Sequence, residues 1–138
     1  MASAKISERI EASATAVWDL LGDFGGVMRY SEGLEGCSTE GEGVGAVRTI
    51  RMPGGLELDE RLEAFDEARR RLSYAITRGP LPLENYLATI EVNEDGDACR
   101  VDWGATYDLK GVTEEQAREM VEGIYTGSLQ AVRKKLGV

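Results

Sequence analysis

The chain has 138 residues and a net charge of −9, with a sequence pI of about 4.6. The length fits one domain covering residues 1–138, and the acidity argues against binding to nucleic acid or to anionic lipid surfaces. Hydrophobic residues make up 42% and charged residues 30%, which is typical of a soluble globular protein. No apolar run approaches the roughly 20 residues that cross a bilayer, so membrane insertion is not expected.

The residue types that are missing narrow the chemistry. Histidine is absent, which removes the commonest general base, the commonest transition-metal ligand, and the Ser-His-Asp and Cys-His nucleophiles. Cys37 and Cys99 lie far apart and in no metal-ligand spacing, so free thiols in a reducing compartment are expected. The first residues lack the apolar stretch of a signal peptide. We therefore expect a cytoplasmic protein with no metal and no cofactor.

The N-terminal part of the chain predicts a strand and then a capped helix. Residues 4–11 have the apolar spacing of a strand. Ser13 stands at an N-cap position before a helix over residues 14–21, whose apolar stripe is Val17, Leu20 and Leu21. A second short helix or turn is expected over residues 24–30.

From residue 34 onward the pattern changes to strands separated by turns. Alternation is clearest over 85–92, and the Asp95-Gly96 pair after it is typical of a hairpin turn. The loop 78–82 contains two prolines, which remove two hydrogen-bond donors from a ladder. The expected strands cover residues 34–40, 45–52, 56–65, 72–77, 85–92 and 99–107.

The last part of the chain predicts a long amphipathic helix. Thr113 and Gln116 have the spacing of a capping box, and the helix is expected to run to about Leu136. Together with the strands this predicts an α+β fold, a curved antiparallel sheet wrapped around a long C-terminal helix. We expect Met120, Ile124 and Ser128 to face the concave side of the sheet. The full set of residues at helical spacing is Ala117, Met120, Val121, Ile124, Tyr125, Ser128, Leu129, Val132 and Leu136.

Two charged residues are expected inside. Arg48 and Glu60 each alternate with apolar residues on what reads as an inward strand face. Isolated buried charges are very costly, so the two should form an ion pair across adjacent strands. Such a pair can fix the strand register, or it can anchor the carbonyl or hydroxyl of a ligand; a pair that lines a cavity can do both.

Aromatic residues with polar tips occupy inward positions on several strands. Tyr74, Tyr86, Trp103 and Tyr107 suit a cavity that holds a ring-bearing or acyl ligand, and they equally suit an ordinary core. Ser128 interrupts the apolar stripe of the last helix, either because it faces a cavity or because it relieves crowding. These alternatives stay open at the level of the residues.

An ordered set of motifs carries a family resemblance. The motifs are Ile10–Ser13 followed by Val17–Leu21, then Gly45–Thr49, Glu60–Ala64, Gly79–Tyr86 and finally Trp103. Together they resemble the helix-grip fold of the START/birch-pollen-allergen superfamily, in particular its bacterial polyketide cyclase/dehydrase and lipid-transport family. The resemblance implies one ligand-binding domain with an internal cavity. The lining expected from strand alternation and from matching family positions is Arg48, Ile50, Met52, Glu60, Tyr74, Ile76, Leu83, Tyr86, Ala88, Trp103, Met120, Ile124 and Ser128.

The same stretches are also similar to the plant abscisic-acid receptors, with departures at functional positions. The connection after Arg48 is short and lacks the receptors' Ser-Gly-Leu-Pro-Ala gate, and Leu81-Pro82-Leu83 lacks the His-Arg of their latch. Ser31 stands where the receptors carry a lysine for the hormone carboxylate. The chain is therefore expected to be a relative by fold rather than a hormone receptor. The loops 53–55 and 79–83 are expected to flank the mouth of the cavity.

We expect a monomer or homodimer that binds or carries a hydrophobic small molecule, such as a lipid, a polyketide-like aromatic or an isoprenoid-like compound. The alternative is a polyketide aromatase/cyclase, with Arg48 as electrophile, Glu60 as base and a cavity tyrosine such as Tyr74 as proton donor. An ion-paired carboxylate is a weak base, which counts against the enzyme. A third possibility is a cavity largely filled by Trp103, Met52 and Met120, which would leave a protein–protein interaction role.

Overall fold

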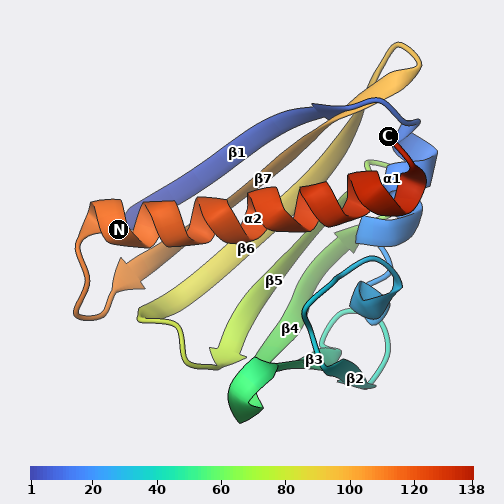
Figure 1. The fold of residues 1–138 in the computed structure, drawn as a ribbon. Helices are drawn as coiled ribbons and strands as arrows, with labels where there is room; N and C mark the ends of the chain where they lie inside the picture. The colour runs from blue at the N-terminus through green and yellow to red at the C-terminus, as the bar shows by residue number, and fades with distance from the viewer.

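The computed structural model describes all residues, 1–138, and contains one seven-stranded sheet. All neighbouring strands are antiparallel, in the order β1-β7-β6-β5-β4-β3-β2, and the long helix α2 crosses one face of the sheet (Figure 1). The predicted α+β fold is thus confirmed. The elements are β1 Ala2–Ile10, α1 Ala14–Leu21, the 3-10 helix η1 Val27–Arg29, β2 Gly36–Glu40, β3 Val47–Met52, the 3-10 helix η2 Pro53–Gly55, β4 Leu56–Asp66, β5 Arg71–Arg78, β6 Leu83–Asp95, β7 Ala98–Leu109 and α2 Glu114–Leu136.

Both helices begin at the residues that the sequence indicates. The Ser13 hydroxyl accepts a hydrogen bond from the Ala16 amide at 3.1 Å. At α2 the capping box is complete: the Thr113 hydroxyl accepts from the Gln116 amide at 3.1 Å, and the Gln116 side chain accepts from the Thr113 amide at 3.0 Å. Gly137 ends α2 with a φ of 75°, a left-handed conformation that glycine adopts without steric penalty.

The last two strands are longer than predicted. Pairing between β6 and β7 runs from Leu83↔Leu109 to Asp95↔Ala98, beyond the stretches in which apolar residues alternate. Backbone hydrogen bonds continue past the buried part of the hairpin, where both faces carry polar side chains and the sequence shows no alternation.

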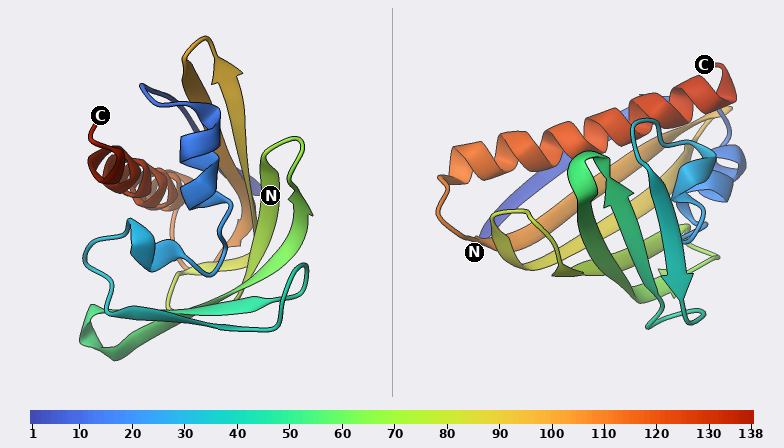
Figure 2. Two further views of the ribbon diagram at one scale, coloured as in Figure 1. Left: turned by 90° about the vertical axis from the view of Figure 1, so that its right-hand side faces the viewer. Right: turned by 60° about the horizontal axis from the view of Figure 1, so that its bottom comes forward.

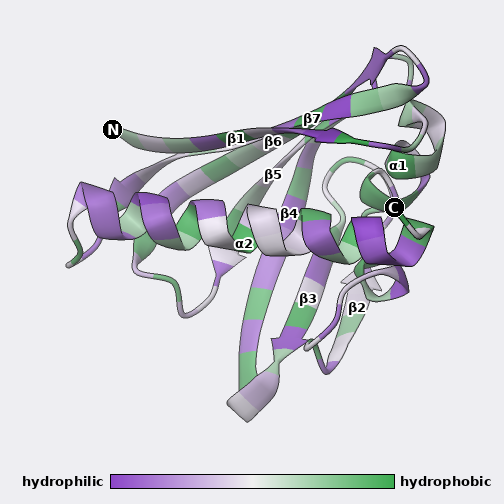
Figure 3. Cartoon of the chain, turned by 45° about the horizontal axis from the view of Figure 1, so that its top comes forward, coloured by the Kyte–Doolittle hydropathy of each residue, from purple (hydrophilic) through white to green (hydrophobic).

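Along the strands, hydrophobic and hydrophilic residues alternate, as a sheet with one buried face requires (Figure 3).

The sheet bends so that β2, β3 and β4 turn toward the side occupied by α2 (Figure 2, left). The β4–β5 register shifts twice, between Asp59 and Glu60 and between Leu62 and Ala64. Such irregularities increase local twist and bend a strand. Helix α1 lies at one end of the concave side, where it packs against β6, β7 and α2. Neither α1 nor α2 is long and apolar enough to serve as a membrane span.

Helix α2 packs mainly against β1 and β7, and only one row of its apolar residues is fully buried. Its C-terminal half is tied to β1 because the Arg133 guanidinium donates to Glu8 Oε1 at 2.7 Å and to the Arg9 carbonyl at 2.8 Å. The buried row is Ala117, Val121, Tyr125, Leu129 and Val132.

The expectation that Ile124 packs onto the concave face is wrong, because 45% of Ile124 is exposed. Ile124 belongs to a row displaced by one residue, about 100° around the helix, from the buried row. Met120 and Ser128 in the same row are half-buried, and the Ser128 hydroxyl donates to the Ile124 carbonyl at 3.0 Å. Because α2 lies over β1 and β7 at one edge of the sheet, this second row overhangs the open side.

Candidate functional site

The most distinctive polar feature of the interior is an ion pair between neighbouring strands. Arg48 on β3 lies directly opposite Glu60 on β4. Glu60 Oε1 contacts Arg48 Nε at 2.8 Å and Arg48 Nη2 at 2.7 Å. Only 8% of Arg48 and 5% of Glu60 are exposed, and no other buried residue is charged. The predicted direct ion pair is confirmed.

All three nitrogens of the Arg48 guanidinium contact other protein groups. Its Nη1 donates to the Phe24 carbonyl at 2.9 Å, and its guanidinium carbon lies 4.1 Å from the Phe24 ring centroid and 5.2 Å from that of Tyr74. Burial is the largest single influence and lowers the pKa of the guanidinium, but the Glu60 carboxylate together with Tyr74 and Tyr30 outweighs it, so the pKa is raised. Arg48 is therefore a charged but internally compensated cation.

Glu60 is only partly engaged. Both contacts with Arg48 end on Oε1, and no protein group donates to Oε2. Tyr107 Oη is the only fully buried side-chain oxygen or nitrogen without a partner, so Glu60 Oε2, which also has none, retains some solvent-accessible surface. The Glu60 side chain lies on the inward face of β4, so this surface is on the concave side. The ion pair thus presents one free hydrogen-bond acceptor.

Aliphatic side chains surround this acceptor. Ile76 on β5 pairs directly with Glu60, and Leu58 precedes Glu60 on the same face of β4. Both are half-buried against the core, which leaves part of each surface uncovered. Other half-buried apolar residues packed against the core include Met52, Leu83 and Met120.

The centre of the interior is occupied by aromatic rings. Trp103 stacks on Tyr125 of α2 at 4.6 Å between centroids, and its indole N–H donates to Tyr74 Oη at 3.2 Å. The Tyr86 and Tyr125 hydroxyls share a hydrogen bond that joins β6 to α2. Tyr107 stacks on Tyr86 at 6.3 Å. Burial raises the pKa of Tyr74, Tyr86 and Tyr125, so all three remain neutral near pH 7.

The predicted lining residues fall into three groups by exposure. The one exposed residue is Ile124. The half-buried residues are Met52, Ile76, Leu83, Met120 and Ser128. The buried members are Arg48, Ile50, Glu60, Tyr74, Tyr86, Ala88 and Trp103.

Four residues of this region were not predicted as site residues: Leu58, which lies beside Glu60 on β4, and Phe24, Tyr125 and Tyr30. Phe24 covers Arg48 through its ring and its carbonyl, and Tyr125 joins the aromatic cluster from α2. Tyr30 is 9% exposed, and burial raises its pKa in the field of Arg48 and Glu60. Tyr125 could have been found from its place in the apolar stripe of the helix. Phe24 and Tyr30 lie outside the strands and α2, where periodicity carries no signal.

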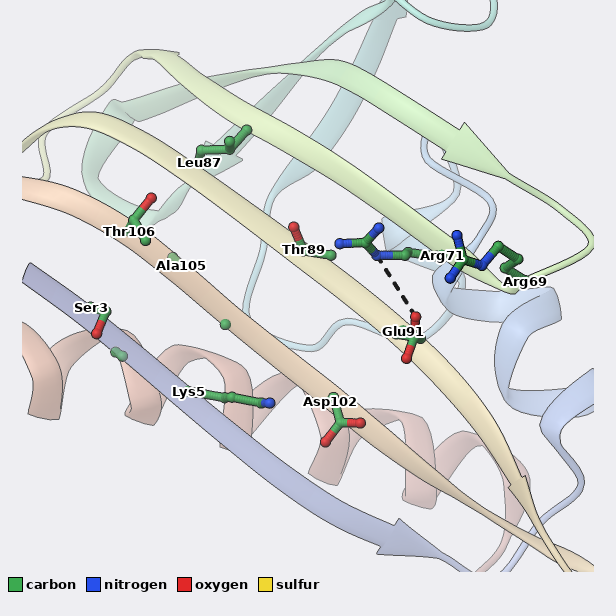
Figure 4. Close-up of a pocket in the computed structure, with 12 residues that line it drawn as sticks. Ser3, Lys5, Arg69, Arg71, Leu87, Thr89, Glu91, Asp102, Ala105 and Thr106 are labelled. Atoms are coloured by element: carbon green, nitrogen blue, oxygen red, sulfur yellow. Dashed lines mark ion pairs between the residues drawn. The ribbon is translucent and has the colours of Figure 1, made fainter.

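The three main hollows on the surface lie elsewhere. The largest of three, about 720 Å³, is on the face of the sheet that points away from α2, where Arg71 and Glu91 form an ion pair beside Thr89 (Figure 4). Hollows of about 390 Å³ and 260 Å³ lie beside Tyr30 and beside Leu109. None of the three is lined by the residues predicted for the cavity, so the enclosed cavity stays a prediction.

One family model and one curated relative match nearly the whole chain. The family model described as polyketide cyclase/dehydrase and lipid transport matches residues 1–137. Abscisic acid receptor PYL2 of Arabidopsis thaliana is 33% identical over 148 aligned residues, which cover 96% of this chain and 74% of the receptor.

Solved structures of similar proteins also match nearly the whole chain. Protein XoxI of Bacillus cereus is 32% identical with a TM-score of 0.89, covering 97% of this chain and 94% of that protein. Ara h 8.0201 has a TM-score of 0.82, with 99% of this chain and 98% of that chain covered. Its identity is only 15%, so this likeness shows the shared helix-grip fold alone.

Proposed function

The chain belongs to the polyketide cyclase/dehydrase and lipid-transport family, and from this premise we propose that it binds and carries a hydrophobic small molecule. The ligand would lie between the concave face of the sheet and α2. The proposed class is a lipid, a polyketide-like aromatic or an isoprenoid-like compound. The similarity to PYL2, an abscisic acid receptor, supports small-molecule binding on this fold.

The observation that carries the proposal is the free oxygen of Glu60. Oε2 is an acceptor without a protein donor, and it lies among aliphatic side chains such as Leu58 and Ile76. Small-molecule sites are mostly apolar and contain a few polar groups that fix orientation. One unfilled acceptor on an otherwise apolar surface fits that description.

The proposed contacts follow from burial. The half-buried side chains would form the walls, with Ile124 and Ser128 at the rim on α2, and the aromatic cluster would form the floor. Entry would occur between the loops 53–55 and 79–83. The walls and floor comprise Arg48, Ile50, Met52, Glu60, Tyr74, Ile76, Leu83, Tyr86, Ala88, Trp103 and Met120. A monomeric or homodimeric state and a cytoplasmic location remain predictions; both cysteines are free, as a reducing compartment would keep them.

The cyclase alternative receives less support from the geometry. Arg48 as electrophile is already paired with Glu60 and bonded to the Phe24 carbonyl, which weakens the positive charge that it can offer a substrate. Tyr74 as proton donor is buried, and burial raises the pKa of its hydroxyl well above the usual value, which makes it a weaker acid. Groups held in this way serve binding and positioning better than proton transfer.

Native mass spectrometry of the purified protein, followed by extraction of any bound compound, tests the proposal. We expect a mass adduct that matches an extracted hydrophobic molecule. Ile76→Trp, which fills the space beside Glu60, should remove the adduct, while Leu87→Trp on the outer face should retain it. The absence of any adduct, together with no increase in Tm over a panel of lipids and aromatic compounds, would contradict the proposal and favour a protein–protein interaction role.

A further inference from the structure

Resting on the proposed function, we infer that this site selects ligands whose polar end is a neutral hydrogen-bond donor, an alcohol or a phenol, over ligands that end in a carboxylate. The interior holds two charges, and the positive one, on Arg48, is already neutralised by the negative one, on Glu60.

The interior offers no cation to a ligand carboxylate. Arg48 is the only buried cation, and it contacts Glu60 through Nε and Nη2 and the Phe24 carbonyl through Nη1. The Phe24 ring also lies against the guanidinium, with its centroid 4.1 Å from the guanidinium carbon. A ligand carboxylate would have to share Arg48 with Glu60, whose negative charge already neutralises the guanidinium.

The half-buried cations do not change this balance. Arg133 is held by Glu8 and by the backbone of β1, and Arg70 contacts Glu94 at 3.5 Å.

The hollow beside Tyr30 contains three exposed cations. Arg29 pairs there with Asp19 at 2.8 Å and with Asp23 at 3.1 Å, and Lys134 pairs with Glu32 at 2.9 Å. Lys135 has no such partner but lies on the solvent side of α2. All three side chains are exposed, so solvent and salt screen the charge that they could offer an acid beside Glu60.

The group that the site does offer is an acceptor. Glu60 Oε2 has no donor, and a carboxylate oxygen can accept a hydrogen bond but cannot donate one. A ligand hydroxyl can donate a charge-assisted hydrogen bond to this oxygen. A ligand carboxylate would instead place a second negative charge beside Glu60 in an apolar surrounding, where repulsion is strong. The same oxygen thus attracts an alcohol and repels an acid.

Matched ligand pairs test the selectivity. Farnesol with farnesoic acid, and 2-naphthol with 2-naphthoic acid, share a skeleton and differ at the polar end. Their Kd values at about pH 7 are measured by displacement of the neutral fluorophore N-phenyl-1-naphthylamine. We expect each alcohol or phenol to bind about tenfold or more tightly than its acid, because the unfilled acceptor is satisfied only by a donor.

A charge-neutral variant gives the decisive comparison. Glu60→Gln leaves Arg48 uncompensated, so the preference should reverse and the acid should bind more tightly than the alcohol. Glu63→Gln on the same strand removes an outer-face carboxylate that pairs with Arg61, and it should leave the preference unchanged. In the wild type, lowering the pH from about 7 to about 5 should reduce the ratio of the Kd of the acid to that of the alcohol, because the ligand's own carboxyl protonates. This measurement does not depend on the folding of Glu60→Gln.

The outcomes separate the two proposals. Acids that bind the wild type as tightly as the alcohols would overturn the selectivity and leave hydrophobic ligand binding intact. An unchanged preference in a folded Glu60→Gln variant would also overturn the selectivity. Failure of the fluorophore and of all four ligands to bind would overturn both.

Discussion

Arg48 and Glu60 face each other across β3 and β4, and both contacts from Arg48 end on the same oxygen of Glu60, Oε1. This arrangement neutralises the only buried cation and leaves one carboxylate oxygen unfilled. The ion pair can therefore fix the register of the two strands and also take part in ligand binding.

The ion pair should show strong energetic coupling. Arg48→Met or Glu60→Leu alone leaves an uncompensated buried charge and should lower the free energy of unfolding by about 3–5 kcal/mol. The double variant replaces both charges with apolar groups and should lose much less. Urea unfolding of the four proteins gives the coupling energy; effects that simply add would show that the two charges act independently.

Two tyrosines should respond differently to loss of the hydroxyl. Tyr107 Oη is buried without a partner, so Tyr107→Phe should leave the free energy of unfolding unchanged or raise it. Tyr125→Phe removes the hydrogen bond to Tyr86 and leaves a buried hydroxyl unsatisfied, so it should destabilise by about 1–3 kcal/mol. The same unfolding assay compares them. A large loss in Tyr107→Phe would indicate a partner, such as an ordered water, for its hydroxyl.

Two glycines in α2 should be replaceable with a gain in stability. Gly123 and Gly127 lie within the helix, and a Cβ on either would have no heavy atom within 4 Å. Alanine should therefore stabilise the protein by about 0.5–1 kcal/mol at each position. Gly137 at a φ of 75° is the control, because alanine is strained there and should destabilise. A loss of stability at Gly123 or Gly127 would mean that packing or a partner requires the glycine.

The protein should unfold in alkali through its tyrosines. All five tyrosines are buried, and burial is the leading cause of the raised pKa of each. A raised pKa in the folded state means that the unfolded state releases these protons first. The buried, protonated tyrosines therefore make their full contribution to the free energy of unfolding below about pH 10, and this contribution is lost as the pH rises further.

Absorbance at 295 nm, recorded together with circular dichroism, measures this transition. Tyrosinate should appear only as the secondary structure is lost. Titration of one or more tyrosines near pH 10 in a folded protein would contradict the burial of those hydroxyls.

The parts of the fold that local chemistry specifies were predictable from the sequence. Ser13 and Thr113 cap the two helices as expected, because a cap depends on residues only three positions apart. The pairing of Arg48 with Glu60 was also predictable, because two charges on inward strand faces have few ways to be neutralised.

Features that depend on docking between distant elements were not predictable. The exposure of Ile124 depends on where α2 lies across the sheet, and helical periodicity cannot choose between neighbouring rows. The contact of Arg48 with the Phe24 carbonyl depends on the path of an irregular segment. The stacking of Trp103 on Tyr125 fills space that strand alternation alone left open.

The central claim is that a hydrophobic ligand binds on the concave side beside Glu60, and methyl NMR tests it most directly. The protein is labelled at Ile, Leu and Met methyl groups and titrated with farnesol. The largest chemical-shift changes are expected at Ile76, Leu58 and Met52, with Leu87 on the outer face unchanged. Saturable shifts centred on Leu87, or no saturable shifts at any methyl group, would contradict the account.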